Sequence, residues 1–139
     1  LDLIVECKPP FSPEQITNEF CNILKTYHIK NIHGDNYAAE WPKEQFRKRG
    51  IEYEKAEKNR SELYLEFIPL VNSEQVSLLD NKKLINQFVS LERRTSRSGR
   101  DSVDHPPGGH DDLANSVAGV LQSVKKKRHT ITVVDIFGI

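Results

Sequence analysis

The first 34 residues change from strand-forming to helix-forming sequence and back, and this pattern restricts the fold more than any other feature. Residues 1–7 are rich in strand formers, and Pro9-Pro10 ends that run. Residues 13–28 carry apolar side chains at spacings of three and four, which predicts a helix. Residues 29–34 are typical of a second short strand. A strand, a helix and a strand in this order predict a crossover unit with two parallel strands.

The rest of the chain continues the alternation. Helices are predicted at 38–49, 61–71, 83–88 and from residue 111 or 112, and further strands at 51–54, 76–79 and 91–94. This order predicts an α/β domain whose sheet is at least partly parallel, with helices on both faces. Ile4, Ile32 and Leu78 are expected inside the sheet.

Two segments are predicted to lie outside the regular elements. Residues 95–109 consist of Ser, Gly, Pro and charged residues without an apolar face, so we expect a long loop. Residues 125–139 are expected to form a C-terminal tail, with an extra edge strand at 130–134.

Composition bounds the function only loosely. The 139 residues are the size of one domain, and 20 basic side chains balance 20 acidic ones, so global charge selects no partner. No run of residues is long and apolar enough to span a membrane. Cys7 and Cys21 have no metal-site spacing and are expected to be reduced thiols. A start at Leu1 and the lack of Met favour an excised domain.

Acidic residues mark the chain at two places. Asp111 and Asp112 follow a turn rich in Pro and Gly and open a predicted helix, where either acid could simply cap the helix. Asp35 directly follows a predicted strand, at the edge where parallel sheets bind ligands, although it could also be an ordinary turn residue. Carboxylates brought together from a strand end and a helix start would form an oxygen site for Mg²⁺ or Mn²⁺.

The same residues carry a resemblance to a known family. The stretch 109–118, which reads Gly-His-Asp-Asp-Leu-Ala-Asn-Ser-Val-Ala, resembles the nuclease domain of phage terminase large subunits, as does the strand that ends at Asp35. The charged connector that leads to residues 61–64 adds to it. The resemblance covers the chain from about Leu3 to Leu121.

This resemblance implies a single nuclease domain over residues 1–139 with an RNase H-like fold, a mixed sheet flanked by helices that lacks its first strands here. It implies that Asp35 and Asp112 or Asp111 bind two Mg²⁺ or Mn²⁺ ions, with His110 beside them as a further catalytic residue. The family's first acid lies on an earlier strand, so this chain is expected to lack one ligand. Its activity would be endonucleolytic cleavage of concatemeric double-stranded DNA with little sequence preference.

Partners and location follow from the same resemblance. Double-stranded DNA would contact the basic segment that contains Arg93, Arg94, Arg97 and Arg100. The other partners would be a terminase ATPase domain, a small terminase subunit and a portal protein, with no membrane, in the cytoplasm of an infected or prophage-bearing bacterium. No phosphate-binding Gly-Lys-Ser/Thr loop occurs in the sequence, which argues against an ATPase or phosphotransferase.

Three alternatives remain open at this point. The chain could be another RNase H-like nuclease or resolvase. It could be a non-catalytic module that docks on the packaging motor through a surface at Trp41 and Phe46. Finally, His105 and His110 with Asp111 could form a zinc site, although a His pair in a loop more often faces solvent.

Overall fold

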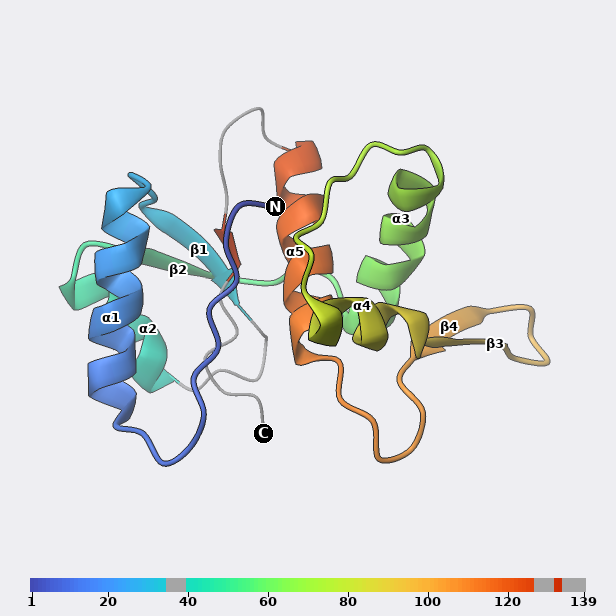
Figure 1. Cartoon of the computed structure of the whole chain (residues 1–139), viewed down its shortest axis with the longest axis horizontal. Helices are drawn as coiled ribbons and strands as arrows, with labels where there is room; N and C mark the ends of the chain where they lie inside the picture. Colours follow the sequence, from blue (N-terminus) through green and yellow to red (C-terminus); the bar gives the residue numbers. More distant parts are fainter. Residues whose placement is uncertain (35–39, 127–131, 134–139) are drawn as a thin grey trace.

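The computed structural model describes residues 1–34, 40–126 and 132–133, and these ranges form a mixed α/β structure (Figure 1). The described helices are α1 (Pro13–Thr26), α2 (Glu40–Lys48), α3 (Arg60–Asn72), α4 (Lys82–Val89) and α5 (Asp112–Lys126). The described strands are β1 (Asn31–Gly34), β2 (Glu52–Lys55), β3 (Glu92–Thr95), β4 (Asp101–Asp104) and β5 (Thr132–Val133). The predicted α/β class is therefore confirmed.

β1 is the middle strand of a three-stranded sheet with the order β2-β1-β5. Both neighbours run parallel to it: His33 pairs with Glu54 of β2, and Ile32 pairs with Thr132 of β5. The parallel connection from β1 through α2 to β2 is a crossover unit. The crossover predicted within residues 1–34 is wrong, because residues 1–7 form no strand to pair with β1. β5 confirms the predicted edge strand over two of its residues.

One face of this sheet carries α1 and α2 (Figure 1). α1 is amphipathic because Ile16, Phe20 and Leu24 recur every four residues, and all three are buried. They pack with Ile32 of β1 and Phe46 of α2, which are both fully buried. This cluster forms the core on the α1 side of the sheet.

α5 lies between the sheet and the rest of the molecule (Figure 1). One side of the helix contacts β1 and β5, and another side packs against α3 and α4. Ala114 and Ala118 are buried in a cluster with Leu63 and Phe67 of α3, and Val117 packs on Leu84 of α4. The position of α5 is therefore fixed from both sides.

Two predicted strands are wrong. Residues 1–7 and 76–79 form no strand in the described chain, although Leu1 donates a hydrogen bond from its amino group to the carbonyl of Ser77 (3.0 Å). Ile4 and Leu78 do lie partly buried, packed against the cluster around Leu84 rather than inside the sheet. Strand-forming composition favours a strand, but a strand also requires a hydrogen-bonded neighbour in a sheet.

The predicted loop at 95–109 is wrong at residue 95 and at residues 101–104, which belong to strands. Residues 92–95 and 101–104 are β3 and β4, an antiparallel hairpin in which Glu92 pairs with Asp104 and Thr95 with Asp101. The hairpin contributes little to the core, because β3 is exposed throughout and β4 buries only Val103. The polar sequence of β4 therefore lacks the hydrophobic alternation that predicts a half-buried strand.

Within the predicted C-terminal segment at 125–139, α5 continues to Lys126, and Thr132–Val133 are the edge strand β5. The other residues of that segment lie outside the described part of the chain. Among the described residues, none of the helices is long and apolar enough to cross a membrane.

Candidate functional site

The loop between β4 and α5 is shaped by its prolines and glycines. The N–H of Gly109 donates to the carbonyl of Pro106 (2.9 Å), which closes a turn over Pro107 and Gly108. Gly108 has a φ of +76°, a value that glycine adopts easily and that type II turns require at their third residue. A Cβ at Gly109 would lie 3.0 Å from the Pro106 oxygen, so this position also favours glycine. The sequence Pro-Pro-Gly-Gly therefore sets the path from β4 to α5.

The first turn of α3 faces this loop. Asn59 caps α3 through a reciprocal capping box with Glu62, so Ser61, the second residue of the helix, does not act as its cap. Ser61 instead accepts a hydrogen bond on its Oγ from the N–H of Val103 in β4 (2.9 Å). This contact holds β4 against α3 and places Arg60 beside the loop.

Asp111 is the most enclosed charged residue of the site. It is 4% exposed, and its Oδ2 accepts a hydrogen bond from the buried hydroxyl of Tyr64 (2.7 Å). Its Oδ1 accepts one from Nη1 of Arg60 (3.0 Å), while Nη2 of the same guanidinium lies 3.1 Å from Oδ1 of Asp104. Arg60 thus joins two carboxylates at opposite ends of the loop. A buried charge needs such partners, and here both carboxylate oxygens of Asp111 have one.

The network shifts the pKa values of its two partners on α3. Burial raises the pKa of Tyr64 far above its ordinary value, and the hydrogen bond to the Asp111 carboxylate raises it further. Burial by itself would lower the pKa of Arg60, but the charges of Asp111 and Asp104 outweigh it and raise that pKa. Arg60 therefore stays charged and Tyr64 stays neutral.

Replacing Tyr64 by phenylalanine is expected to lower the free energy of unfolding by about 1.5–3 kcal/mol, the usual contribution of a hydrogen bond to a charged group. It should also change the alkaline limb of a stability–pH profile. Above about pH 10 the unfolded chain loses the Tyr64 proton and the folded chain keeps it, so wild-type stability falls as the pH rises. Urea unfolding at pH 8 to 11 would measure both effects; an equally steep fall in the variant would contradict the assignment.

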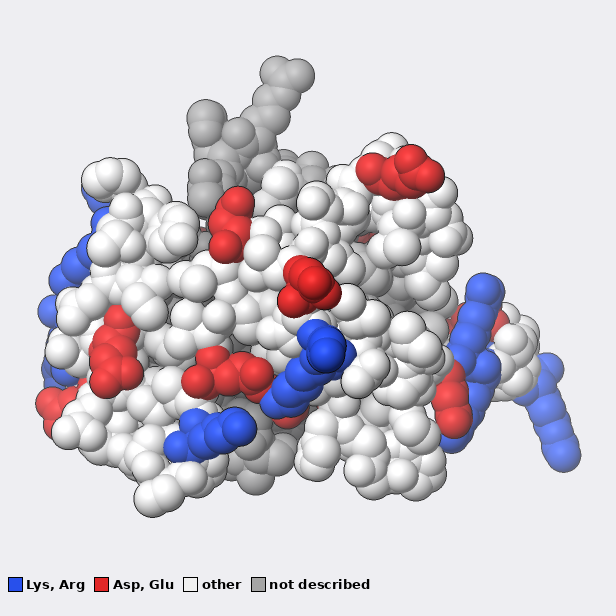
Figure 2. All heavy atoms as spheres, in the orientation of Figure 1, with Lys and Arg blue, Asp and Glu red and all other residues white. Residues whose placement is uncertain are grey.

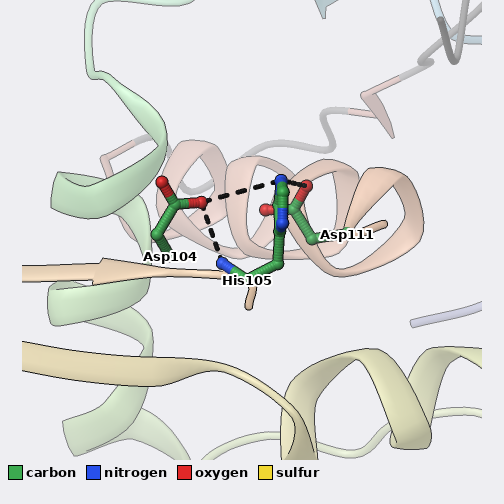
Figure 3. A group of neighbouring side chains, drawn as sticks. All are labelled: Asp104, His105 and Asp111. Atoms are coloured by element: carbon green, nitrogen blue, oxygen red, sulfur yellow. Dashed lines mark hydrogen bonds and ion pairs between the residues drawn. The ribbon is translucent and has the colours of Figure 1, made fainter. Parts of the chain in front are cut away.

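His105 stands between the two carboxylates (Figure 3). Its Nδ1 lies 2.9 Å from the carbonyl oxygen of Pro106, and its Nε2 lies 3.8 Å from Oδ1 of Asp104 and 3.9 Å from Oδ1 of Asp111. One ligand atom from each of these three residues falls within 4.8 Å of the others. The structure thus brings together Asp104, His105 and Asp111.

The other predicted catalytic residues are placed differently. Asp112 is the first residue of α5 and is half-buried, and it has no hydrogen-bond or ion-pair partner among the described residues. His110 is exposed, which does not support the zinc alternative that pairs it with His105. Asp35 lies outside the described residues. The strand before it, β1, ends at Gly34 and contains His33, whose buried Nε2 lies 3.7 Å from Oε2 of Glu54.

The predicted DNA-binding arginines divide into two pairs on the β3–β4 hairpin. Arg93 forms an ion pair with Asp101, and Arg94 lies 2.6 Å from Oε2 of Glu92. Figure 2 shows these opposite charges gathered on the hairpin at the right of the view. Arg97 and Arg100 are exposed in the hairpin loop and have no ion-pair partner among the described residues.

The surface proposed for docking is not confirmed. Phe46 is fully buried in the core on the α1 side of the sheet, so it belongs to the interior. The side chain of Trp41 lies outside what the structure describes. The prediction that Phe46 forms part of a docking surface is therefore wrong.

Arg60 and Tyr64 are the site residues that sequence reasoning missed. They lie 51 and 47 residues from Asp111 along the chain. A local signal was present, since an arginine and a tyrosine four residues apart share one face of α3 with core residues. The pairing itself depends on how α3 packs against α5.

Comparisons of this chain with models of known families, with curated proteins and with solved structures found no match.

Proposed function

We propose that this chain is the nuclease domain of a phage terminase large subunit, with an RNase H-like fold, and that it cuts double-stranded DNA with two divalent metal ions. The sequence resemblance at residues 109–118 supports the proposal. The observation that carries it further is the position of α5, which begins at Asp112 and packs against β1. In Figure 1, β1 ends toward the half of α5 that contains Asp112, and Asp35 is the next residue in the sequence after β1.

Asp112 is a better ligand for a catalytic ion than Asp111. Both carboxylate oxygens of Asp111 already accept hydrogen bonds from α3, whereas Asp112 has no such partner among the described residues. Asp35 and Asp112 would hold the ions, which would activate a water molecule and stabilise the leaving 3′ oxygen. A third acid from an earlier strand would complete the set, as the resemblance implies.

The proposed partners also come from the resemblance: DNA as the substrate, and the ATPase domain, small subunit and portal of a packaging motor in the bacterial cytoplasm. Clustered carboxylates suit Mg²⁺ and Mn²⁺ because these ions prefer oxygen ligands.

Cleavage of supercoiled plasmid tests this proposal directly. We expect nicking in Mn²⁺ or Mg²⁺ that EDTA abolishes and that the Asp35→Ala variant loses. Because a ligand from an earlier strand is expected, the assay should include the chain extended upstream by a few dozen residues. If neither this chain nor the extended chain nicks the plasmid in Mn²⁺ or Mg²⁺, the proposed nuclease activity is refuted.

The hairpin arginines give a separate expectation for DNA binding. Arg97 and Arg100 should contact phosphates more strongly than Arg93 and Arg94, whose charges are already paired within the hairpin. The double variant Arg97→Ala/Arg100→Ala should weaken binding and reduce the slope of log affinity against log salt by about 2, close to one per lost phosphate contact. Filter binding at several salt concentrations would measure this, with Arg93→Ala/Arg94→Ala as the matched control. An equal or larger loss in the control would reverse the assignment.

A further inference from the structure

We infer that Asp104, His105 and Asp111 form a binding site for a divalent transition-metal ion that accepts an imidazole ligand, with Zn²⁺ as the best representative. This centre differs from the proposed Asp35–Asp112 centre in residues and in chemistry, and it does not depend on the proposed nuclease activity. It would join the end of β4 to the start of α5 across the Pro-Gly loop (Figure 3).

The orientation of His105 is the first support. A carbonyl oxygen only accepts hydrogen bonds, so the 2.9 Å contact with Pro106 requires that the hydrogen of a neutral imidazole be on Nδ1. Nε2 then carries a bare lone pair. Histidine ligands of metals typically donate their other N–H to a carbonyl or carboxylate in this way, which fixes the ring and the tautomer. The same Pro106 oxygen accepts the N–H of Gly109, so the turn itself holds the ring.

The groups that face Nε2 are the second support. Its neighbours at 3.8 and 3.9 Å are carboxylate oxygens of Asp104 and Asp111, which also only accept hydrogen bonds. With a neutral ring, three electron-rich atoms face one another at distances too long for a direct hydrogen bond. Arg60 donates to the two oxygens, but neither of its contacts reaches Nε2. Oδ1 of Asp104 also accepts the backbone N–H of His105 (2.8 Å), so both oxygens already have donors. Nε2 of the neutral ring is the atom that a cation would supply with a partner.

The spacing suits a metal ion. Bonds from Zn²⁺ to imidazole nitrogen and carboxylate oxygen are about 2.0–2.2 Å long, so two atoms on one ion lie at most about 4.4 Å apart. The separations of 3.8 and 3.9 Å fall within that limit, and all three atoms lie within 4.8 Å of one another. Only a small closing movement of the half-exposed Asp104 side chain would be needed.

The donor set decides which ion is favoured. Mg²⁺ prefers an all-oxygen shell, whereas Zn²⁺ binds imidazole and carboxylate together. Each carboxylate oxygen has two lone pairs, so Oδ1 of Asp111 can accept from Arg60 and still bind an ion. The positive charge of Arg60 nevertheless repels the ion, so this arginine should reduce the affinity.

Calorimetric titration of the full chain with Zn²⁺, with Mg²⁺ in excess, tests the site. We expect one Zn²⁺ per chain, at least about a tenfold loss of affinity in His105→Ala and in Asp104→Asn, and no change in His110→Ala, which removes an exposed histidine from the same loop. Arg60→Gln should bind several-fold more tightly, because it removes the repelling charge. Tighter Zn²⁺ binding by Arg60→Gln would distinguish a metal site from a set of purely structural contacts, because the same substitution would only weaken those contacts.

The site is overturned if the wild-type chain binds no Zn²⁺, or if His105→Ala and His110→Ala behave alike. It is also overturned if Asp112→Asn abolishes binding while His105→Ala does not, since the ion would then belong to the Asp35–Asp112 centre. Circular dichroism of each variant verifies that the fold is retained. If the chain binds Zn²⁺ as expected but shows no nuclease activity, only the proposed function is contradicted.

Discussion

Replacing Asp111 by alanine is expected to lower the free energy of unfolding by about 1–4 kcal/mol, the sum of about 1–3 kcal/mol for a buried hydroxyl left without its acceptor and up to about 1 kcal/mol for the ion pair with the partly exposed Arg60. The variant leaves the buried hydroxyl of Tyr64 without its acceptor and removes one of the two carboxylates that Arg60 joins. The loop from Asp104 to α5 would lose its main contact with α3. Domains are stable by only about 5–15 kcal/mol, so such a loss is a large part of the total.

Asp112→Ala is the matched control, because it removes the neighbouring acid, which is the first residue of α5. Asp112 has no partner among the described residues, so its loss should cost no more than the favourable interaction with the helix terminus, about 0.3–1 kcal/mol. Urea unfolding followed by circular dichroism measures both variants. Similar losses in the two would show that the contacts of Asp111 with α3 contribute little to stability.

Part of this site could be predicted from the sequence, and the different roles of its two acids could not. The turn and the two acids were visible in Pro-Pro-Gly-Gly-His-Asp-Asp, because Gly, Pro and Asp have strong local preferences. The different roles of Asp111 and Asp112 were not visible, since they depend on Arg60 and Tyr64 from another helix. Asp111 immediately precedes α5 and Asp112 begins it, and only packing against α3 decides which of the two side chains is buried.

In the rest of the fold, too, elements with a strong local sequence pattern were predictable and elements without one were not. α1 was predictable because Ile16, Phe20 and Leu24 repeat at the helical period, and β1 because an apolar residue lies at the centre of a short run. A strand at 91–94 was predicted and corresponds to β3, but β4 and its pairing with β3 were not, because the hairpin depends on backbone pairing and charged side chains rather than on an apolar face. Residues 1–7 were misread for the opposite reason, since their composition favours a strand that the described chain does not pair.

Metal-dependent DNA cleavage is expected to depend on Asp112 rather than on Asp111. If Asp112 holds a catalytic ion, Asp112→Asn should reduce the rate of metal-dependent DNA cleavage at least about a hundredfold, because metal ions supply several kcal/mol of transition-state stabilisation and each 1.36 kcal/mol is a factor of ten. Its unfolding free energy should change little, since asparagine is also accepted at helix starts. Single-turnover cleavage of linear duplex, with Mn²⁺ varied, measures the rate and the metal requirement together.

Asp111→Asn distinguishes this result from general damage to the site. Asparagine at position 111 keeps an oxygen that can accept from Tyr64 but loses the charge that pairs with Arg60, so stability should fall more than in Asp112→Asn. Cleavage by the fraction that remains folded should fall less. A larger loss of cleavage in Asp111→Asn, measured under conditions where both proteins are fully folded, would move the catalytic ligand to Asp111. In that case α3 would contact the catalytic centre directly through Arg60, and the Zn²⁺ titration would test the same carboxylate.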